Sequence, residues 1–459
     1  MTEVQDLAAF ATGCTAGDLS DDALQELKIR VLDTVGVAIG ALDAPPLVAI
    51  RELVVEECGA GDCSLIGGGS TNASLAAFYT SALSRYLDFM DAYLAKGETN
   101  HPSDNFGAVL AAAEKVHASG AELLTALAVA YQVHTRLADV APVRARGFDH
   151  TTQGAFAAAA GAAKAMRLTS GQAANAIAMA GTANVALRVT RTGNLSNWKG
   201  LAYAHVSRNA VFAAQLAERG ITGPELVFEG NKGFKQSVSG PFDIDWAAED
   251  LESVRRTVVK KHNAEIHSQS ALDAAQDARA QPGFDAAQIA RVRLRTFDVA
   301  YSIIGGGEEG DKRAVRTKEE ADHSLPWMLA VVLLDGELTP RQYAPDRIVA
   351  DDVQALMRRV QIEPDAGFSA RFPAEMPAEL EVTLTSGATI RTARDGYRGF
   401  TTDPFRWGDA RAKFDAVTAR FVGSELRDEI ADTVHDLDNA QTADLTNLLR
   451  RVPTADGSR

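Results

Sequence analysis

Two short stretches hold most of the residues whose types and spacing suit acid–base chemistry. The first places Asp88 and Asp91 three residues apart and continues to His101, which opens the sequence His-Pro-Ser-Asp-Asn. The second, residues 260–270, holds two lysines, two histidines and a glutamate in an otherwise acidic chain. Cations and neutral donors bind carboxylates by charge-assisted hydrogen bonds, and imidazole exchanges protons near neutral pH. Together the two stretches favour proton transfer on a small molecule that carries carboxylates.

Histidines in polar, turn-bearing segments are the candidates for moving protons. Four of them share this context: His101, His150, His262 and His267, with His323 placed just behind them. Each also has a structural interpretation, because His150 and His323 stand where residues cap the helices that follow. The basic stretch could equally be a solvated loop. The remaining histidines lie in or beside predicted helices and are interpreted as structural: His117, His134, His205 and His435.

Other kinds of chemistry lack their sequence signatures. The chain contains no HExxH or CxxC motif, and His262 and His267 are five residues apart rather than four, so no metal site is expected. Gly305 to Gly307 lacks the Gly-Lys-Ser/Thr ending of a phosphate loop and is interpreted as a flexible loop. A GxSxG nucleophile elbow is also absent. With these motifs absent, the chemistry that the sequence still favours is acid–base catalysis by His, Lys and Asp.

Composition limits the partners and the location of the protein. The 459 residues carry a formal net charge of −15, which disfavours nucleic acid and anionic membranes as partners. Three cysteines in no metal-binding pattern indicate a reducing compartment. The opening residues have no basic or apolar region typical of a signal peptide, and no uncharged run is long enough to span a membrane. We therefore expect a cytoplasmic protein.

The hydrophobic pattern predicts a mainly α protein with a smaller α+β part. Helical spacing runs from about residue 74 to Asp91, then over 106–117, 121–137, 170–187 and 199–219, with an Ala/Gly-rich helix after His150. Pro102 should keep His101 outside the first of these helices. Period-two alternation appears at 292–297, 379–385 and 388–392, the last two joined by a Ser-Gly hairpin signal. We predict a helical domain over 1–268, joined by C-terminal helices in 405–459, and an α+β lid domain over 269–404.

Three motifs resemble one known family. Leu87-Asp88-Phe89 followed by His101-Pro102-Ser103-Asp104-Asn105 resembles the LDF…HPSDN stretch of the MmgE/PrpD family. Residues 264–271 resemble the AEFHSQTA segment of its 2-methylcitrate dehydratases. Residues 322–324, with the apolar helix and the stretch 334–339 after them, resemble the DHC…LLFGRLT region. The order and spacing agree over nearly the whole chain.

The resemblance implies a helical main domain, a smaller lid domain, and a cofactor-free active site between them in a homodimer. Members include 2-methylcitrate dehydratase, cis-aconitate decarboxylase and an iminodisuccinate epimerase, which share proton transfer beside carboxylates. Asp88 and His101 match the first motif, and His150 matches the histidine before the Ala-rich helix. Lys199 matches a lysine that opens a later helix. Lys261 and residues 262–267 match the basic segment.

Two positions depart from the family pattern. Ala92 stands where relatives often carry Thr, and Trp327 where they carry Tyr. Because an indole cannot donate a proton as a phenol does, a reaction that needs this Tyr as its acid, such as decarboxylation, is disfavoured.

The resulting hypothesis is a metal-independent hydro-lyase of propionate catabolism that dehydrates 2-methylcitrate or a close tricarboxylate. His101 and Lys199 form the acid/base pair and Asp88 orients one of them, while His150, Lys261 and His267 bind carboxylates. The remaining substrate-binding predictions are His262, Ser268, Gln269 and His323. The alternatives are an epimerase, isomerase or decarboxylase of a related acid, and a non-catalytic binding member of the fold.

Overall fold

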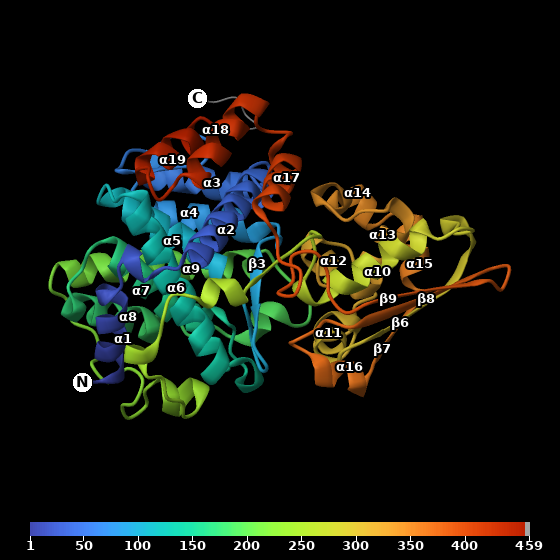
Figure 1. Cartoon of the computed structure of the whole chain (residues 1–459), viewed down its shortest axis with the longest axis horizontal. Helices are drawn as coiled ribbons and strands as arrows, with labels where there is room; N and C mark the ends of the chain where they lie inside the picture. The colour runs from blue at the N-terminus through green and yellow to red at the C-terminus, as the bar shows by residue number, and fades with distance from the viewer. Residues whose placement is uncertain (455–459) are drawn as a thin grey trace. The chain divides into compact units, whose positions relative to one another are not determined.

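The computed structural model describes residues 1–454, which form two compact units. The first unit comprises Met1–Arg188, Gly200–Thr257 and the chain from Phe405 onward. The second comprises Val189–Lys199 and Val258–Pro404. Figure 1 shows a helical first unit and a second unit with a sheet and helices. The predicted fold class, a large helical part with a smaller α+β part, is therefore confirmed.

Main-chain hydrogen bonds place residues 258–268 in the second unit, whereas the sequence pattern put the boundary at 268/269. The N–H of Val259 donates to the carbonyl of Gly399, and that of Asn263 to Leu338. The N–H of Glu265 donates to the carbonyl of Asp322. These partners lie 57 to 140 residues later in the chain, so a local pattern could not locate this boundary.

The helices of the first unit pack through small residues and begin at polar caps. Ser119 and Glu122 form a capping box at α6, and Asn72 accepts the N–H of Leu75 at α4. A Cβ added to Gly161 of α7 would lie 2.7 Å from Val109 Cγ2 and 2.9 Å from Ala130 Cβ, so glycine lets α7 approach α5 and α6. The helices are α1 Glu3–Gly13, α2 Asp21–Gly40, α3 Pro45–Glu57, α4 Ala73–Tyr86, α5 Phe106–Lys115, α6 Gly120–Val140, α7 Thr151–Ala165, α8 Ser170–Ala183, α9 Trp198–Glu218, α17 Trp407–Thr418, α18 Ser424–His435 and α19 Thr442–Arg450. The first two residues of α9, Trp198 and Lys199, belong to the second unit.

The predicted helix through Asp91 is wrong. Helix α4 ends at Tyr86, Asp88 has a φ of 55°, and Asp91 begins strand β3 (Asp91–Leu94). Strand β3 pairs antiparallel with β4 (Thr99–Asn100). Asp88 and Asp91 therefore share no helix face. An aspartate tolerates the left-handed region better than most residues do, which lets the chain turn at Asp88. His101 follows β4 directly and lies outside a helix, as the position of Pro102 led us to expect.

The second unit is built on a four-stranded sheet in the order β7-β6-β8-β9. Alternate residues of β6 and β8, among them Val292, Leu294 and Leu380, are buried in a core with α10 and α13. On the other face, arginines and carboxylates pair across strands, as Arg293 does with Glu363. The strands are β6 Ile289–Thr296, β7 Val360–Pro364, β8 Ala378–Leu384 and β9 Thr389–Arg394. The helices are α10 Gln269–Ala280, α11 Asp298–Ala300, α12 Lys318–Ala321, α13 Leu325–Asp335, α14 Pro345–Ile348, α15 Asp351–Met357 and α16 Ala366–Arg371.

Two short strands, β1 Cys63–Ser64 and β2 Ser70–Thr71, pair in the first unit, and β5 Val258–Val259 opens the second stretch of the second unit. The three cysteines are free.

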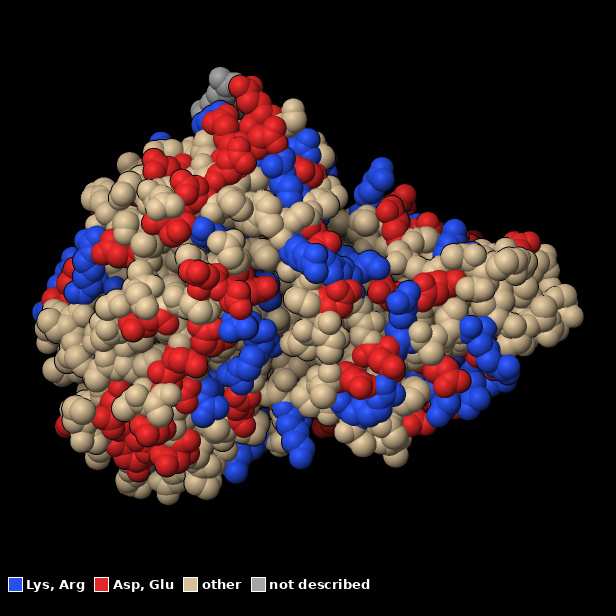
Figure 2. Space-filling model, in the orientation of Figure 1, with Lys and Arg blue, Asp and Glu red and all other residues tan. Residues whose placement is uncertain are grey.

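Within residues 1–454, no single helix has the length and apolarity to cross a membrane. The pair α2–α3 meets these criteria only when the two helices are taken together, and it is bent by 94°. Acidic side chains are spread over the helices of the first unit in the face drawn in Figure 2, in keeping with the net negative charge.

Candidate active site

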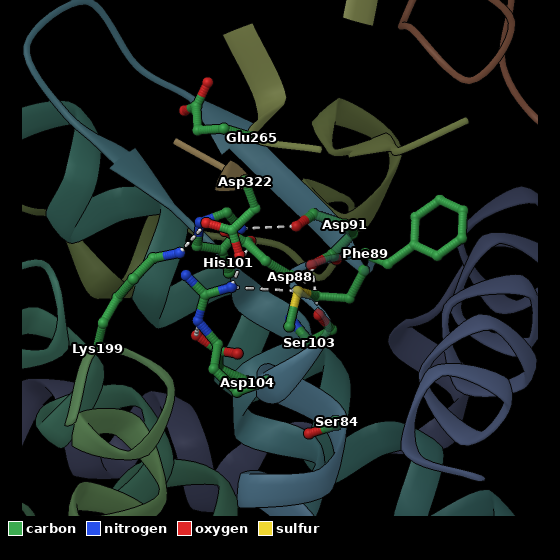
Figure 3. Close-up of polar contacts among 12 residues, drawn as sticks. Ser84, Asp88, Phe89, Asp91, His101, Ser103, Asp104, Lys199, Glu265 and Asp322 are labelled. Carbon is green, nitrogen blue, oxygen red and sulfur yellow. Dashed lines mark hydrogen bonds and ion pairs between the residues drawn. The ribbon is translucent and has the colours of Figure 1, made fainter. Parts of the chain in front are cut away.

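His101 is held by strand β3 and by the turn that follows it. Its Nδ1 lies 2.8 Å from the main-chain carbonyl oxygen of Asp91 (Figure 3). A carbonyl only accepts, so Nδ1 carries the hydrogen, and the lone pair of the neutral ring is on Nε2. The ring is buried, with 7% exposed. This tautomer is the one in which Nε2 can act as a base.

The carboxylate of Asp91 fixes the same turn. Its Oδ1 accepts the N–H of Ser103 at 3.1 Å and the Ser103 hydroxyl at 2.6 Å, and its Oδ2 accepts the Tyr131 hydroxyl at 2.8 Å. Ser103 lies in the 3₁₀ turn Pro102–Asn105, directly after His101. Asp91 therefore orients His101 through both its main chain and its side chain.

Arg85, at the end of α4, contacts Asp88, which precedes β3, and Asp104, which lies within this turn. Its Nη1 donates to Asp88 Oδ1 at 2.6 Å, and its Nε lies 3.7 Å from Asp104 Oδ2. All three residues are buried. Sequence reasoning did not select Arg85 or Asp104 as site residues. An arginine near a helix C-terminus is too common a feature to mark a site.

His150 lies beside His101, although 49 residues separate them in sequence. The two ring centroids are 5.4 Å apart in an edge-on arrangement. His150 Nδ1 lies 3.4 Å from Asp149 Oδ1, and its Nε2 lies 3.9 Å from Asp104 Oδ2. His150 is the N-cap residue of α7, but the side chain that accepts the N–H of Thr151 is that of Asp149, through Oδ1, rather than the His150 ring. We call Arg85, Asp88, Asp91, His101, Asp104 and His150 the imidazole group.

A neutral histidine lies behind this group. His134 is fully buried, and its Nδ1 lies 3.3 Å from Nδ2 of Asn105, whose Oδ1 accepts the Tyr203 hydroxyl at 2.8 Å. Burial lowers the pKa of His134 to about 3 and raises the pKa of Tyr203 well above its ordinary value. Both side chains are therefore uncharged at neutral pH and support the turn that carries His101.

In the second unit, two lysines and a histidine contact the carboxylate of Asp322. Lys199 Nζ lies 2.6 Å from Asp322 Oδ1 (Figure 3), and Lys318 Nζ lies 2.6 Å from Oδ2. His323 Nδ1 donates to Oδ1 at 2.8 Å. Burial alone would raise the pKa of Asp322, but the charges of Lys199 and Lys318, together with His323, hold it well below its usual range. Sequence reasoning placed Lys199 and His323 in the site but did not select Asp322 or Lys318.

Glu265 pairs with His267 in the same unit. Glu265 Oε1 lies 2.6 Å from His267 Nδ1, and Oε2 accepts the His267 N–H at 2.7 Å. Burial raises the pKa of Glu265, but the opposing charges of His267, His323 and Lys260 together bring it down to about 2. The His267 ring packs against Phe297 and Phe372, at centroid distances of 5.9 and 5.6 Å.

The two neighbouring lysines of the basic stretch have different surroundings. Lys260 is fully buried and contributes to the low pKa of Glu265. The Lys261 side chain is 37% exposed, and its Nζ lies 2.6 Å from Asp273 Oδ1, which also contacts His262 Nε2 at 2.8 Å. We call Lys199, Lys260, Glu265, His267, Lys318, Asp322 and His323 the lysine group.

Ser268 and Gln269 bind main-chain groups in the structure. The Ser268 hydroxyl donates to the Glu265 carbonyl at 2.6 Å. Gln269 Oε1 accepts the N–H groups of Lys261 and His262, each at 2.9 Å, and its Nε2 donates to the His262 and Ala264 carbonyls. Both side chains thus hold the shape of the basic stretch.

The two positions that depart from the family pattern are buried. Ala92 lies within β3. Trp327 is in the core of the second unit, where its Nε1 donates to the Ile348 carbonyl at 3.2 Å and its ring stacks on Tyr343 at 5.2 Å. The indole N–H is therefore occupied by a structural hydrogen bond.

Comparison with known proteins agrees with these motifs. Residues 5–247 match the MmgE/PrpD N-terminal domain and residues 262–439 match the MmgE/PrpD C-terminal domain. The chain is 30% identical to a 2-methylcitrate dehydratase of Cupriavidus necator over 387 residues, 78% of each chain. It is 28% identical to a 2-methylcitrate dehydratase of Escherichia coli K12 over 74% of each chain. It is 24% identical to a cis-aconitate decarboxylase of Mus musculus over 97% of this chain and 93% of that one. With both domains matched along most of its length, the chain belongs to the MmgE/PrpD family.

Proposed function

We propose that the protein is a hydro-lyase that dehydrates 2-methylcitrate or a close tricarboxylate to the corresponding aconitate, without a metal ion. The observation that carries the substrate class is the composition of the lysine group. It contains three lysines and two histidines against two carboxylates, in a chain whose net charge is −15. Such a local excess of cations suits a ligand with several carboxylates.

The reaction needs one base and one acid. The base removes a proton from the carbon next to a carboxylate, the carbon–oxygen bond of the hydroxyl breaks, and the acid gives that hydroxyl a proton. Water and a carbon–carbon double bond are the products. In this proposal His101 is the base, because its Nδ1 donates to the Asp91 carbonyl and the lone pair of the neutral ring is on Nε2.

The ion pair with Asp322 supports the role of Lys199 as the acid. A carboxylate at 2.6 Å keeps the Lys199 amine protonated, so it starts with a proton to give and a charge that attracts carboxylates. His267, His323 and Lys260 are proposed to bind substrate carboxylates. Lys261 and His262, which share Asp273, are proposed to support the segment rather than to bind the substrate directly.

The direct test is the ultraviolet absorbance of the unsaturated product. Purified protein is mixed with 2-methylcitrate, or with citrate, in the presence of EDTA. We expect absorbance to rise with at least one substrate and to be unaffected by the chelator. A His205→Ala variant, altered at an exposed histidine of α9, should retain this rate. No rise with either substrate would remove the dehydratase proposal, and a rise abolished by EDTA would remove its metal independence.

The adjacent imidazoles favour one second candidate. His101 and His150, with ring centroids 5.4 Å apart, could act as two bases in an epimerase or isomerase of a dicarboxylate. That reaction would incorporate deuterium from D₂O into recovered substrate without any absorbance change. Decarboxylation is less favoured, because Trp327 is buried and hydrogen-bonded where relatives carry Tyr.

A further inference from the structure

The loop Leu87–Met90 presents Asp88 in a backbone conformation that needs support. Asp88 has a φ of 55°, in the left-handed region. For a residue other than glycine, this region is sterically unfavourable. Arg85 binds the Asp88 carboxylate, and the Asp88 N–H donates to the Arg85 carbonyl. These contacts hold the loop from its N-terminal side.

A lysine from α17, the first of the three C-terminal helices, holds the other side of this loop. Lys413 Nζ donates to the Phe89 carbonyl at 2.6 Å and lies 3.9 Å from the centroid of the Phe89 ring. The same ammonium lies 2.7 Å from Asp33 Oδ1. Exposed fractions of the Lys413 and Asp33 side chains are 8% and 1%. The carbonyl next to Asp88 is therefore held by a buried ion pair.

Close helix packing determines where this ion pair lies. Asp33 is in α2, which packs against α17. A Cβ added to Gly36 would lie 3.0 Å from Phe414 Cδ2, and one added to Gly40 would lie 2.3 Å from Val417 Cγ1. Glycines at these two positions let α17 approach α2 closely. Lys413 thus contacts the loop from a helix that is closely packed against α2.

We propose that Lys413, with Asp33, is a positioning residue that holds the Leu87–Met90 loop so that Asp88 keeps the conformation needed for catalysis. It acts on the main chain of the loop and does not touch the substrate. The inference rests on the proposed function, through the role of Asp88. It gives helix α17 a role in positioning the site, although neither residue lies in the motifs that carry the family resemblance.

The test removes the ion pair without leaving a buried charge alone. The double variant Asp33→Asn/Lys413→Met keeps the side-chain sizes and removes both charges, because truncating one partner of a buried pair is strongly destabilising. The matched control is Lys28→Met/Asp438→Asn. Lys28 is also on α2 and pairs with Asp438 of the C-terminal region, and its side chain is 5% exposed. The variant Lys413→Arg keeps the charge and the donors.

Two measurements are made on each variant. The first is amide hydrogen exchange in a peptide that covers residues 86–91, and the second is kcat and KM with 2-methylcitrate. We expect the double variant to exchange faster in this peptide and to lose about 10- to 100-fold in kcat, since small misplacements of catalytic groups have effects of this size. KM should change less than kcat. The control should resemble the wild type in both measurements, and Lys413→Arg should recover part of kcat.

The outcomes separate this inference from the proposed function. Unchanged exchange in residues 86–91, or a loss of kcat as large in the control variant, would overturn the positioning role. A wild-type protein that dehydrates nothing would overturn the proposed function. In that case the exchange measurement still decides whether Lys413 holds the loop.

Discussion

The imidazole group and the lysine group are mostly buried, with the Lys318 side chain 13% exposed, and one carboxylate of each group, Asp91 and Asp322, shows how their surroundings differ. Asp91 accepts hydrogen bonds from a hydroxyl, a phenol and a main-chain N–H. Asp322 instead contacts two ammonium groups and an imidazole. Neutral donors orient a carboxylate without cancelling its charge, whereas ammonium groups cancel it. The first group is thus arranged to orient imidazoles, and the second to concentrate positive charge.

The largest effect on activity is expected from a substitution in the imidazole group. His101→Ala removes the proposed base, so kcat with the active substrate should fall about 10²- to 10⁴-fold, the usual contribution of a general base. The measurement is the initial rate of absorbance change, with circular dichroism as a check of folding. A residual kcat within about threefold of wild type would exclude His101 as the base and make His150 the next residue to test.

A smaller effect, on stability, is expected from removing the carboxylate of Glu265 in the lysine group. The pKa of Glu265 is lowered from near 4.5 to about 2, so its carboxylate contributes stability above pH 4.5 that is lost as the pH falls toward 2. The full contribution is on the order of 3 kcal/mol. Urea unfolding should find Glu265→Gln less stable than wild type at pH 7, with the difference shrinking between pH 4.5 and 3. A difference independent of pH would mean that the Glu265–His267 pair is not ionic.

His134, which supports the turn of the imidazole group, should also make the stability of the protein depend on pH. Its pKa falls from near 6.5 to about 3 on folding, so only the unfolded chain takes up this proton between these values. Stability should therefore decrease as the pH falls below 6.5, by up to about 1.4 kcal/mol per pH unit from this residue alone. His134→Gln keeps an acceptor for Asn105 and should reduce this slope in urea unfolding between pH 6.5 and 5. An unchanged slope would mean that His134 is protonated in the folded protein.

The smallest effect is a difference in KM between substitutions of the two adjacent lysines, Lys260 and Lys261. Lys260→Met should raise KM for the active substrate about tenfold, since a charged hydrogen bond to a ligand contributes about 1.5–3 kcal/mol. Lys261→Met is the matched control and should change KM by less than about threefold, because its partner Asp273 lies outside the lysine group. The reverse order of effects would assign carboxylate binding to Lys261, as the family resemblance implied.

Local patterns predicted most of the fold. The helices over 106–115 and 120–140, the strands β6, β8 and β9, and the hairpin at Gly387 agree with the periodicity of the sequence. These elements carry their signals within a few residues. The failure at Asp91 has a tertiary cause. Its helical spacing was overridden by pairing with the β4 strand and by hydrogen bonds to Ser103 and Tyr131.

The sequence by itself determined the family, the mainly α character with an α+β part, and the residue types available for proton transfer. Only the tertiary structure decided that Lys260 rather than Lys261 lies with Glu265, that Arg85 and Asp104 accompany the two imidazoles, and that Lys413 reaches Phe89. The physical reason is that the direction and protonation of a side chain depend on partners that folding brings together. Lys413 and Phe89, for example, are separated by 324 positions in the chain.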